Sequence, residues 1–178
     1  MRRTGTTRRG AITATGALAL GAVLAGCGDG GGHQNDSGQT GTASAAAAEQ
    51  ARAARTERKL RASAARTSRE LLARYDQVAR THPATTAGLA PLRDAVRAHA
   101  TELSPDDGGT TPAPAPSAAA DARSAVKELA AAERRAADTH TATLLQAPPE
   151  LARLLASIAA ADAVHAQLLT ELAKETTS

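Results

Sequence analysis

The chain has almost no aromatic side chains. Its 178 residues include no Trp and no Phe, and Tyr75 is the one aromatic residue. Ala supplies most of the 42% of hydrophobic residues, so the large apolar side chains are mainly Leu with some Val and Ile. A chain of this size and composition can bury only a thin core. Because Ala favours helix and strand-forming residues are scarce, an all-helical fold is expected.

The chain beyond its first ten residues is not basic, although the formal net charge of the whole sequence is +3. Four of the 21 Lys and Arg residues lie in the first ten positions, and the other 17 stand against 18 acidic residues. The body is therefore close to neutral, at −1. Nucleic-acid binding needs a basic surface and, for single strands, stacking aromatics. We expect no nucleic-acid partner.

The chain has a single cysteine, which excludes an internal disulfide. This cysteine follows the three parts of a secretory signal in their required order. A basic start carries Arg2, Arg3, Arg8 and Arg9, and the uncharged, mostly apolar stretch 11–25 follows. That stretch is short of the roughly 20 residues that a membrane span needs, and Gly and Thr dilute it.

The segment Leu24-Ala25-Gly26-Cys27 resembles the lipobox of bacterial lipoproteins. The resemblance implies a diacylglyceryl group on the Cys27 thiol, cleavage just before it, and anchoring at the extracytoplasmic face of the cell membrane. Two acyl chains anchor stably where one is marginal. Residues 7–12 loosely resemble a twin-arginine motif, which leaves both that route and general secretion open. The Ala, Arg and Gly bias indicates an actinobacterial source.

Composition divides the chain into five segments. Residues 1–26 form the signal peptide, and 27–43, rich in Gly, Asp, Ser and Thr after the lipidated cysteine, form a flexible tether. Apolar spacings of three and four predict four helices. They cover 44–81, a second segment that ends near 103, 118–146 and 148–174. Gly88 and Pro91 predict a kink or a late start in the second helix. The Pro/Gly-rich segment 104–117 links the helical hairpins 44–103 and 118–178, which predicts an all-α four-helix bundle.

Polar residues interrupt the inner stripes of the last two helices. Glu133 and His140 lie on the third, and Asp162 and His165 on the fourth. The short turn at 147–150 places Glu133 level with Asp162 and His165, and His99 of the second helix is expected to join them. An alternative seam on the fourth helix turns Asp162 toward the surface.

This spacing resembles the ferritin-like family, in which inward Glu residues and Glu-x-x-His pairs bind two metal ions. Asp162-Ala163-Val164-His165 stands where one such pair would be, with Asp in place of Glu. The resemblance covers 55–174 and implies metal ligands at Glu133, Asp162, His165 and His99. Val96 occupies the place of one carboxylate, and Glu70 on the first helix is off the stripe. A complete di-iron site is therefore not expected.

Three interpretations of these residues remain open: a structural polar cluster, a solvated face and a metal site. The lone cysteine is consumed by lipid, and neither a nucleophile elbow nor a nucleotide-binding loop is present. We therefore expect no enzyme and no cofactor. The leading hypothesis is a membrane-anchored, extracytoplasmic lipoprotein whose bundle supports or binds an unidentified protein partner. The alternatives are a degenerate ferritin-like metal-binding protein and an extracytoplasmic small-ligand binder.

Overall fold

A computed structural model describes residues 37–104 and 115–176. The signal peptide 1–26, Cys27, the first part of the tether and the middle of the 104–117 linker lie outside the described residues. The structure groups Gly38–Ser178 as one compact unit, which we call the helical body.

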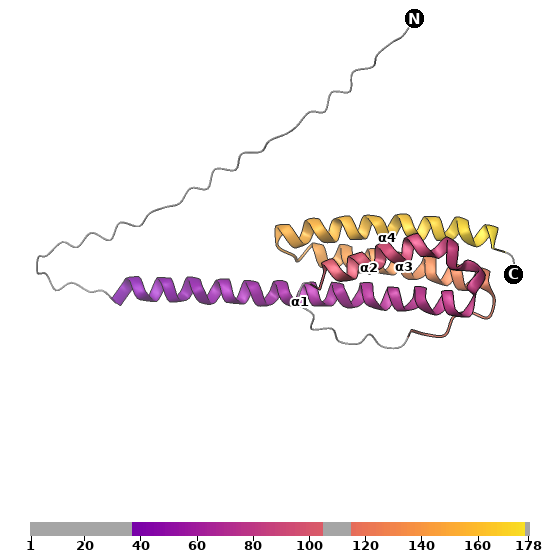
Figure 1. Cartoon of the computed structure of the whole chain (residues 1–178). Coiled ribbons are helices and arrows are strands. Elements are labelled where there is room, and N and C mark those ends of the chain that lie inside the picture. Colours follow the sequence, from indigo (N-terminus) through magenta and orange to yellow (C-terminus); the bar gives the residue numbers. More distant parts are fainter. Residues whose placement is uncertain (1–36, 105–114, 177–178) are drawn as a thin grey trace, which may run out of the picture. The chain divides into compact units, whose positions relative to one another are not determined.

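The described residues form helices and connections, without a strand, which confirms the all-helical expectation. Figure 1 shows α2, α3 and α4 lying alongside the C-terminal part of α1. None of the helices among the described residues is long and apolar enough to span a membrane. The elements are α1 (Ser37–Thr81), the 3₁₀ turn η1 (Pro83–Thr85), α2 (Thr86–Glu102), α3 (Ala122–Leu144) and α4 (Pro149–Glu175).

The helix boundaries follow local chemistry. α1 begins at Ser37, earlier than the expected residue 44, because extending an existing Ala-rich helix by about two turns costs far less than nucleating one. It ends at Thr81 because His82, which precedes Pro83, takes a non-helical φ of −127° and ψ of 73°. α2 begins at Thr86 and runs through Pro91, so the late start at Pro91 does not occur.

The third helix starts later than expected, at Ala122 instead of residue 118. Asp121 is its N-cap, with an extended backbone and a side chain that accepts a hydrogen bond from the Ser124 backbone N–H at 2.8 Å. The preceding residues are held across the bundle end, since His82 Nε2 lies 2.9 Å from the Ala119 carbonyl oxygen. α4 begins with Pro149 and carries Glu150 in its first turn, as the sequence predicts.

The apolar core has two clusters, one toward each end of the body. The first includes Leu71, Tyr75 and Leu169, and the second includes Leu103, Leu155 and Ile158. Along α2 and α4 the two clusters are separated by a stretch without residues of either cluster, and His99, Asp162 and His165 lie in this stretch. They contact the buried side chains of Glu133 and His140, and Glu133 in turn contacts Tyr75 of the first cluster. We call these six residues the polar layer: Tyr75, His99, Glu133, His140, Asp162 and His165. Both core clusters lie between Leu60 and Ala173 and are therefore contained in the helical body.

Candidate metal centre

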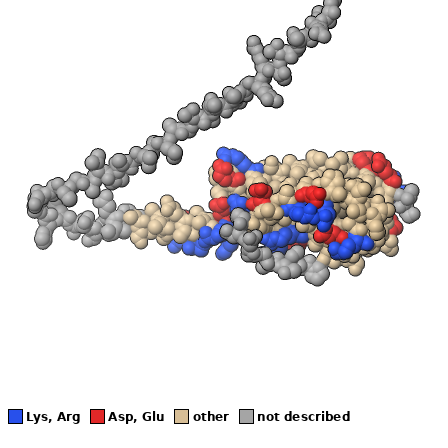
Figure 2. Space-filling view, viewed as in Figure 1, with Lys and Arg blue, Asp and Glu red and all other residues tan. Residues whose placement is uncertain are grey.

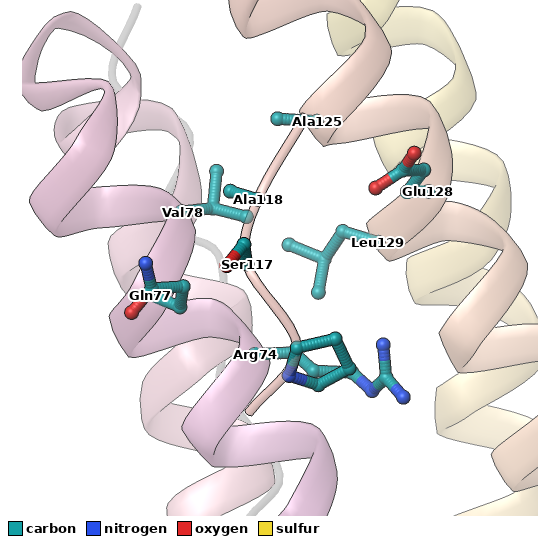
Figure 3. A pocket seen from close by; sticks show the side chains of 9 residues that line it. Arg74, Gln77, Val78, Ser117, Ala118, Ala125, Glu128 and Leu129 are labelled. Atoms are coloured by element: carbon teal, nitrogen blue, oxygen red, sulfur yellow. The ribbon is translucent and has the colours of Figure 1, made fainter. Parts of the chain in front are cut away.

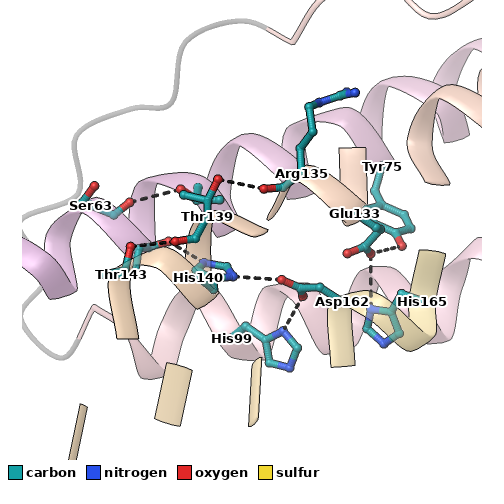
Figure 4. Close-up of polar contacts among 12 residues, drawn as sticks. Ser63, Tyr75, His99, Glu133, Arg135, Thr139, His140, Thr143, Asp162 and His165 are labelled. Carbon is teal, nitrogen blue, oxygen red and sulfur yellow. Dashed lines mark hydrogen bonds and ion pairs between the residues drawn. The ribbon is translucent and has the colours of Figure 1, made fainter. Parts of the chain in front are cut away.

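All four helices contribute to the polar layer (Figure 4). Tyr75 comes from α1, His99 from α2, Glu133 and His140 from α3, and Asp162 and His165 from α4. Glu133 and His140 are 0% exposed, Asp162 is 1% exposed and His165 is 8% exposed. The His99 side chain is 20% exposed, so the layer is closed except near α2.

Asp162 lies between two histidines. Its Oδ2 is 2.9 Å from His140 Nδ1, and its Oδ1 is 3.7 Å from His99 Nδ1. The other ring nitrogen of His140, Nε2, lies 3.4 Å from the Ala64 carbonyl oxygen on α1. His140 is therefore held at both nitrogens, and it orients Asp162 so that Oδ1 faces His99.

Glu133 is held through one oxygen. The Tyr75 hydroxyl donates to its Oε1 at 2.5 Å, and His165 Nδ1 lies 3.3 Å from the same oxygen. The other oxygen, Oε2, has no hydrogen-bond partner among the described residues. Tyr75 thus orients the carboxylate and leaves one oxygen available.

The two less buried histidines stack across the α2–α4 contact. Their rings are 6.2 Å apart between centroids and inclined by 11°. Among the described residues the Nδ1 atoms of both rings make no well-formed hydrogen bond, and each faces a carboxylate oxygen instead, at 3.3 Å for His165 and 3.7 Å for His99. Buried polar atoms are nearly always paired, and each unpaired one costs about 1–3 kcal/mol. In this layer Glu133 Oε2 is unpaired, and the two Nδ1 atoms have only these longer contacts.

Burial sets the charge preferences of these groups. Desolvation raises the pKa of Glu133 above 4.5, and the neighbouring His165 ring and Tyr75 hydroxyl only partly oppose it. Burial, together with the charge of Glu133, raises the pKa of the Tyr75 hydroxyl. Desolvation lowers the pKa of His99 below 6.5, so its ring favours the neutral form that binds metals. A bound cation would favour the ionised form of Glu133.

The donors are close enough to share one ion. One ligand atom from each of Glu133, Asp162 and His165 lies within 4.8 Å of the other two. Ligands about 2.0–2.2 Å from a metal lie at most about 4.4 Å apart, so small side-chain rotations suffice. Imidazole nitrogen combined with carboxylate oxygen suits divalent zinc, iron or manganese.

The four residues expected to meet, Glu133, Asp162, His165 and His99, are brought together. The alternative seam on the fourth helix is wrong, because Asp162 is buried while Leu168 of that seam is 49% exposed. A solvated face is likewise wrong for Glu133 and Asp162. His140, on the same inner stripe as Glu133, is fully buried and contacts the Asp162 carboxylate.

Sequence reasoning missed the role of Tyr75. The available signal was that the only aromatic residue carries a hydroxyl, and a buried hydroxyl needs a partner. The level of α1 relative to α3, which makes Glu133 that partner, was not available from spacing.

A separate hollow lies between α1, the segment 116–118 and α3 (Figure 3). Its volume is about 340 Å³, with Val78 and Leu129 lining it and Arg74 and Glu128 among its polar residues. No residue of the polar layer lines this hollow. A small ligand bound in this hollow would not contact the buried histidines and carboxylates.

We expect Glu133→Gln to stabilise the metal-free protein near neutral pH. Because the folded state raises the pKa of Glu133, it binds this proton more tightly than the unfolded chain does. That contribution is complete below the unfolded pKa and is lost as pH rises through the folded value. Thermal unfolding of both proteins between about pH 4 and pH 8 should show a Tm advantage for the variant that grows with pH. An advantage that instead grows toward acid pH would contradict this assignment.

No protein-family model, no curated protein and no solved structure matches this chain.

Proposed function

We propose that this protein is an exported, lipid-anchored four-helix bundle that binds one divalent transition-metal ion inside its helical body. The ligands are His99, Glu133, Asp162 and His165. The observation that carries the proposal is the convergence of ligand atoms of Glu133, Asp162 and His165 within 4.8 Å of one another, together with Glu133 Oε2, a buried oxygen without a hydrogen-bond partner among the described residues. The anchoring part rests on the N-terminal pattern that ends at Cys27.

A metal explains this arrangement better than a structural polar cluster does. In a structural cluster, buried carboxylates and imidazoles pair with each other, and few atoms stay unpaired. Here Asp162 Oδ2 and Glu133 Oε1 are paired, while Glu133 Oε2 has no partner among the described residues and the His165 and His99 Nδ1 atoms make only longer contacts to carboxylate oxygens, at 3.3 and 3.7 Å. Two buried carboxylates also form an electron-rich site that attracts a cation.

The remaining members of the layer support the ligands. His140 hydrogen-bonds Asp162, and Tyr75 hydrogen-bonds Glu133, so each carboxylate is held by a group that is not itself a proposed ligand. Such outer partners fix ligand orientation, and their loss typically weakens metal affinity by about 10–100-fold. When bound, the ion would neutralise the carboxylates and take the Nδ1 atoms of His165 and His99 as ligands.

The site resembles the ferritin-like pattern only in part. Val96 is fully buried in the apolar core where a carboxylate would stand, and Glu70 of α1 is exposed. The proposal is therefore one ion instead of two. The donor set favours zinc, iron(II) or manganese(II) over calcium and magnesium, which prefer oxygen ligands alone.

Metal titration of the helical body tests the proposal. After treatment with a chelator, residues 38–178 should bind one equivalent of zinc, measured by calorimetry and by elemental analysis. At 100 times the Kd, binding adds about 2.7 kcal/mol of stability, which raises Tm by several degrees.

The variant His165→Ala should bind no zinc and show no rise in Tm. The matched control is His82→Ala, which removes a histidine at the end of α1, outside the polar layer. Equal zinc binding by His165→Ala and the unmodified body, or no binding by either, would refute the site.

A further inference from the structure

The N-terminal part of α1 extends beyond the core of the helical body (Figure 1). Every residue from 43 to 56 is exposed, and the first α1 side chain packed against a core cluster is Leu60. α1 has 45 residues, compared with 17 in α2. This part of the helix therefore contributes no side chain to the core, and its surface is available for another purpose.

Basic side chains occupy one face of α1, from this exposed part into the part that packs against the core (Figure 2). Arg52, Arg55, Lys59 and Arg66 follow one another at intervals of three, four and seven residues, which places them along one side of a helix. All four are exposed. We call these four residues the basic face.

The basic face points away from the other helices. Ala64, Ala65 and Ser68, which are buried, lie on the other side of α1. Between Arg52 and Arg66 the one acidic residue is Glu57, which is half-buried and pairs with Arg61 at 3.3 Å, off this face. Arg52 is 3.7 Å from Glu49, and among the described residues the other three members make no ion pair.

We propose that the basic face lies against a membrane surface of anionic phospholipid. The proposal rests on the lipid anchor proposed above, because that anchor keeps α1 near a membrane. Nine residues separate Cys27 from Ser37, and a chain of this length spans at most about 35 Å. Arg52 lies about 22 Å further along the helix, and the basic face itself is about 21 Å long.

A flat anionic surface fits this face better than other partners do. Four cations in line on one helix can reach a flat surface together, and the tether raises their local concentration there. Nucleic acid fits poorly, because the body outside the basic face is acidic and the one aromatic residue, Tyr75, is buried. Pairing with a second copy would bring the four cations of each copy close together.

Vesicle sedimentation of residues 38–178 tests the proposal. At low ionic strength the body should bind vesicles of phosphatidylglycerol and phosphatidylcholine but not vesicles of phosphatidylcholine alone. Added salt should weaken this binding, since it screens exposed charges. Each basic residue near an anionic surface contributes roughly five-fold to partition. Changing all four members of the basic face to Gln should lower it by roughly 100-fold or more.

A control variant with the same net charge separates the face from the total charge. It changes four exposed basic residues elsewhere to Gln: Arg97, Arg134, Arg153 and Lys174. It should retain vesicle binding within a few-fold. Gln has nearly the helix propensity of Arg and Lys, so both variants should keep the far-ultraviolet circular dichroism of the unmodified body.

Three outcomes overturn the proposal: no binding to the anionic vesicles, equal weakening in both variants, or a dimer without vesicles that only the basic-face variant abolishes. The last would assign the face to contact between copies. Because the tested body lacks Cys27, the result does not depend on lipidation. Failure of the anchor is detected separately, by the mass of the native protein.

Discussion

Replacing Cys27 with Ala should move the protein from the membrane fraction to the soluble fraction. Each acyl methylene buried in the bilayer contributes about 0.8 kcal/mol, so two chains bind far more strongly than any exposed side chain of the body. Without the thiol no diacylglyceryl group can be attached. The measurement is fractionation of cells that express either protein, followed by immunoblotting of both fractions.

The fractionation needs a high-salt wash, which removes proteins held by charge alone. Wild type should stay in the membrane after the wash, and Cys27→Ala should be released by it. A second control keeps Cys27 but carries Gln at the four positions of the basic face, and it should also stay in the membrane. Mass spectrometry that finds residues 1–26 attached and no acyl chain on the wild-type protein would rule out the anchor.

Changes at Tyr75 should produce the largest losses of stability in the helical body. Tyr75 is fully buried in the first core cluster and donates to Glu133. Truncation to Ala leaves a cavity and removes the donor, which should cost about 3–5 kcal/mol. Tyr75→Phe keeps the ring but leaves Glu133 Oε1 without this donor, so the expected cost is about 1–3 kcal/mol.

Denaturant unfolding followed by far-ultraviolet circular dichroism measures both variants, because neither retains an aromatic hydroxyl as a spectroscopic probe. Leu145→Ala is the control, since Leu145 is 79% exposed and its loss should change stability by less than about 0.5 kcal/mol. A Phe variant as stable as wild type would show that Glu133 does not depend on Tyr75, and the support assigned to that hydroxyl would have to be withdrawn.

Local chemistry was enough to predict the helical elements. Ala content, apolar spacing and the prolines at 83 and 148–149 predicted the number of helices and the ends of α1 and α4. The late start of α3 was also available locally, because Asp121 is a strong N-cap residue, but the preceding Ala residues were counted as helix. The early start of α1 could not be predicted locally, because Ser, Gly and Thr have weak helix preference. The helix reaches Ser37 only because it extends from the adjacent Ala-rich segment.

The polar layer was also predictable only in part. Glu133, Asp162 and His165 could be predicted as neighbours, because the tight turn after α3 determines how α3 and α4 align. The sequence by itself therefore determined an all-helical body with ionisable groups on its inner stripes. Only the tertiary structure decided that Asp162 faces inward and that Tyr75 meets Glu133. The rotation of each helix, and the level of α1 against α3 across a long linker, depend on packing between residues distant in the chain.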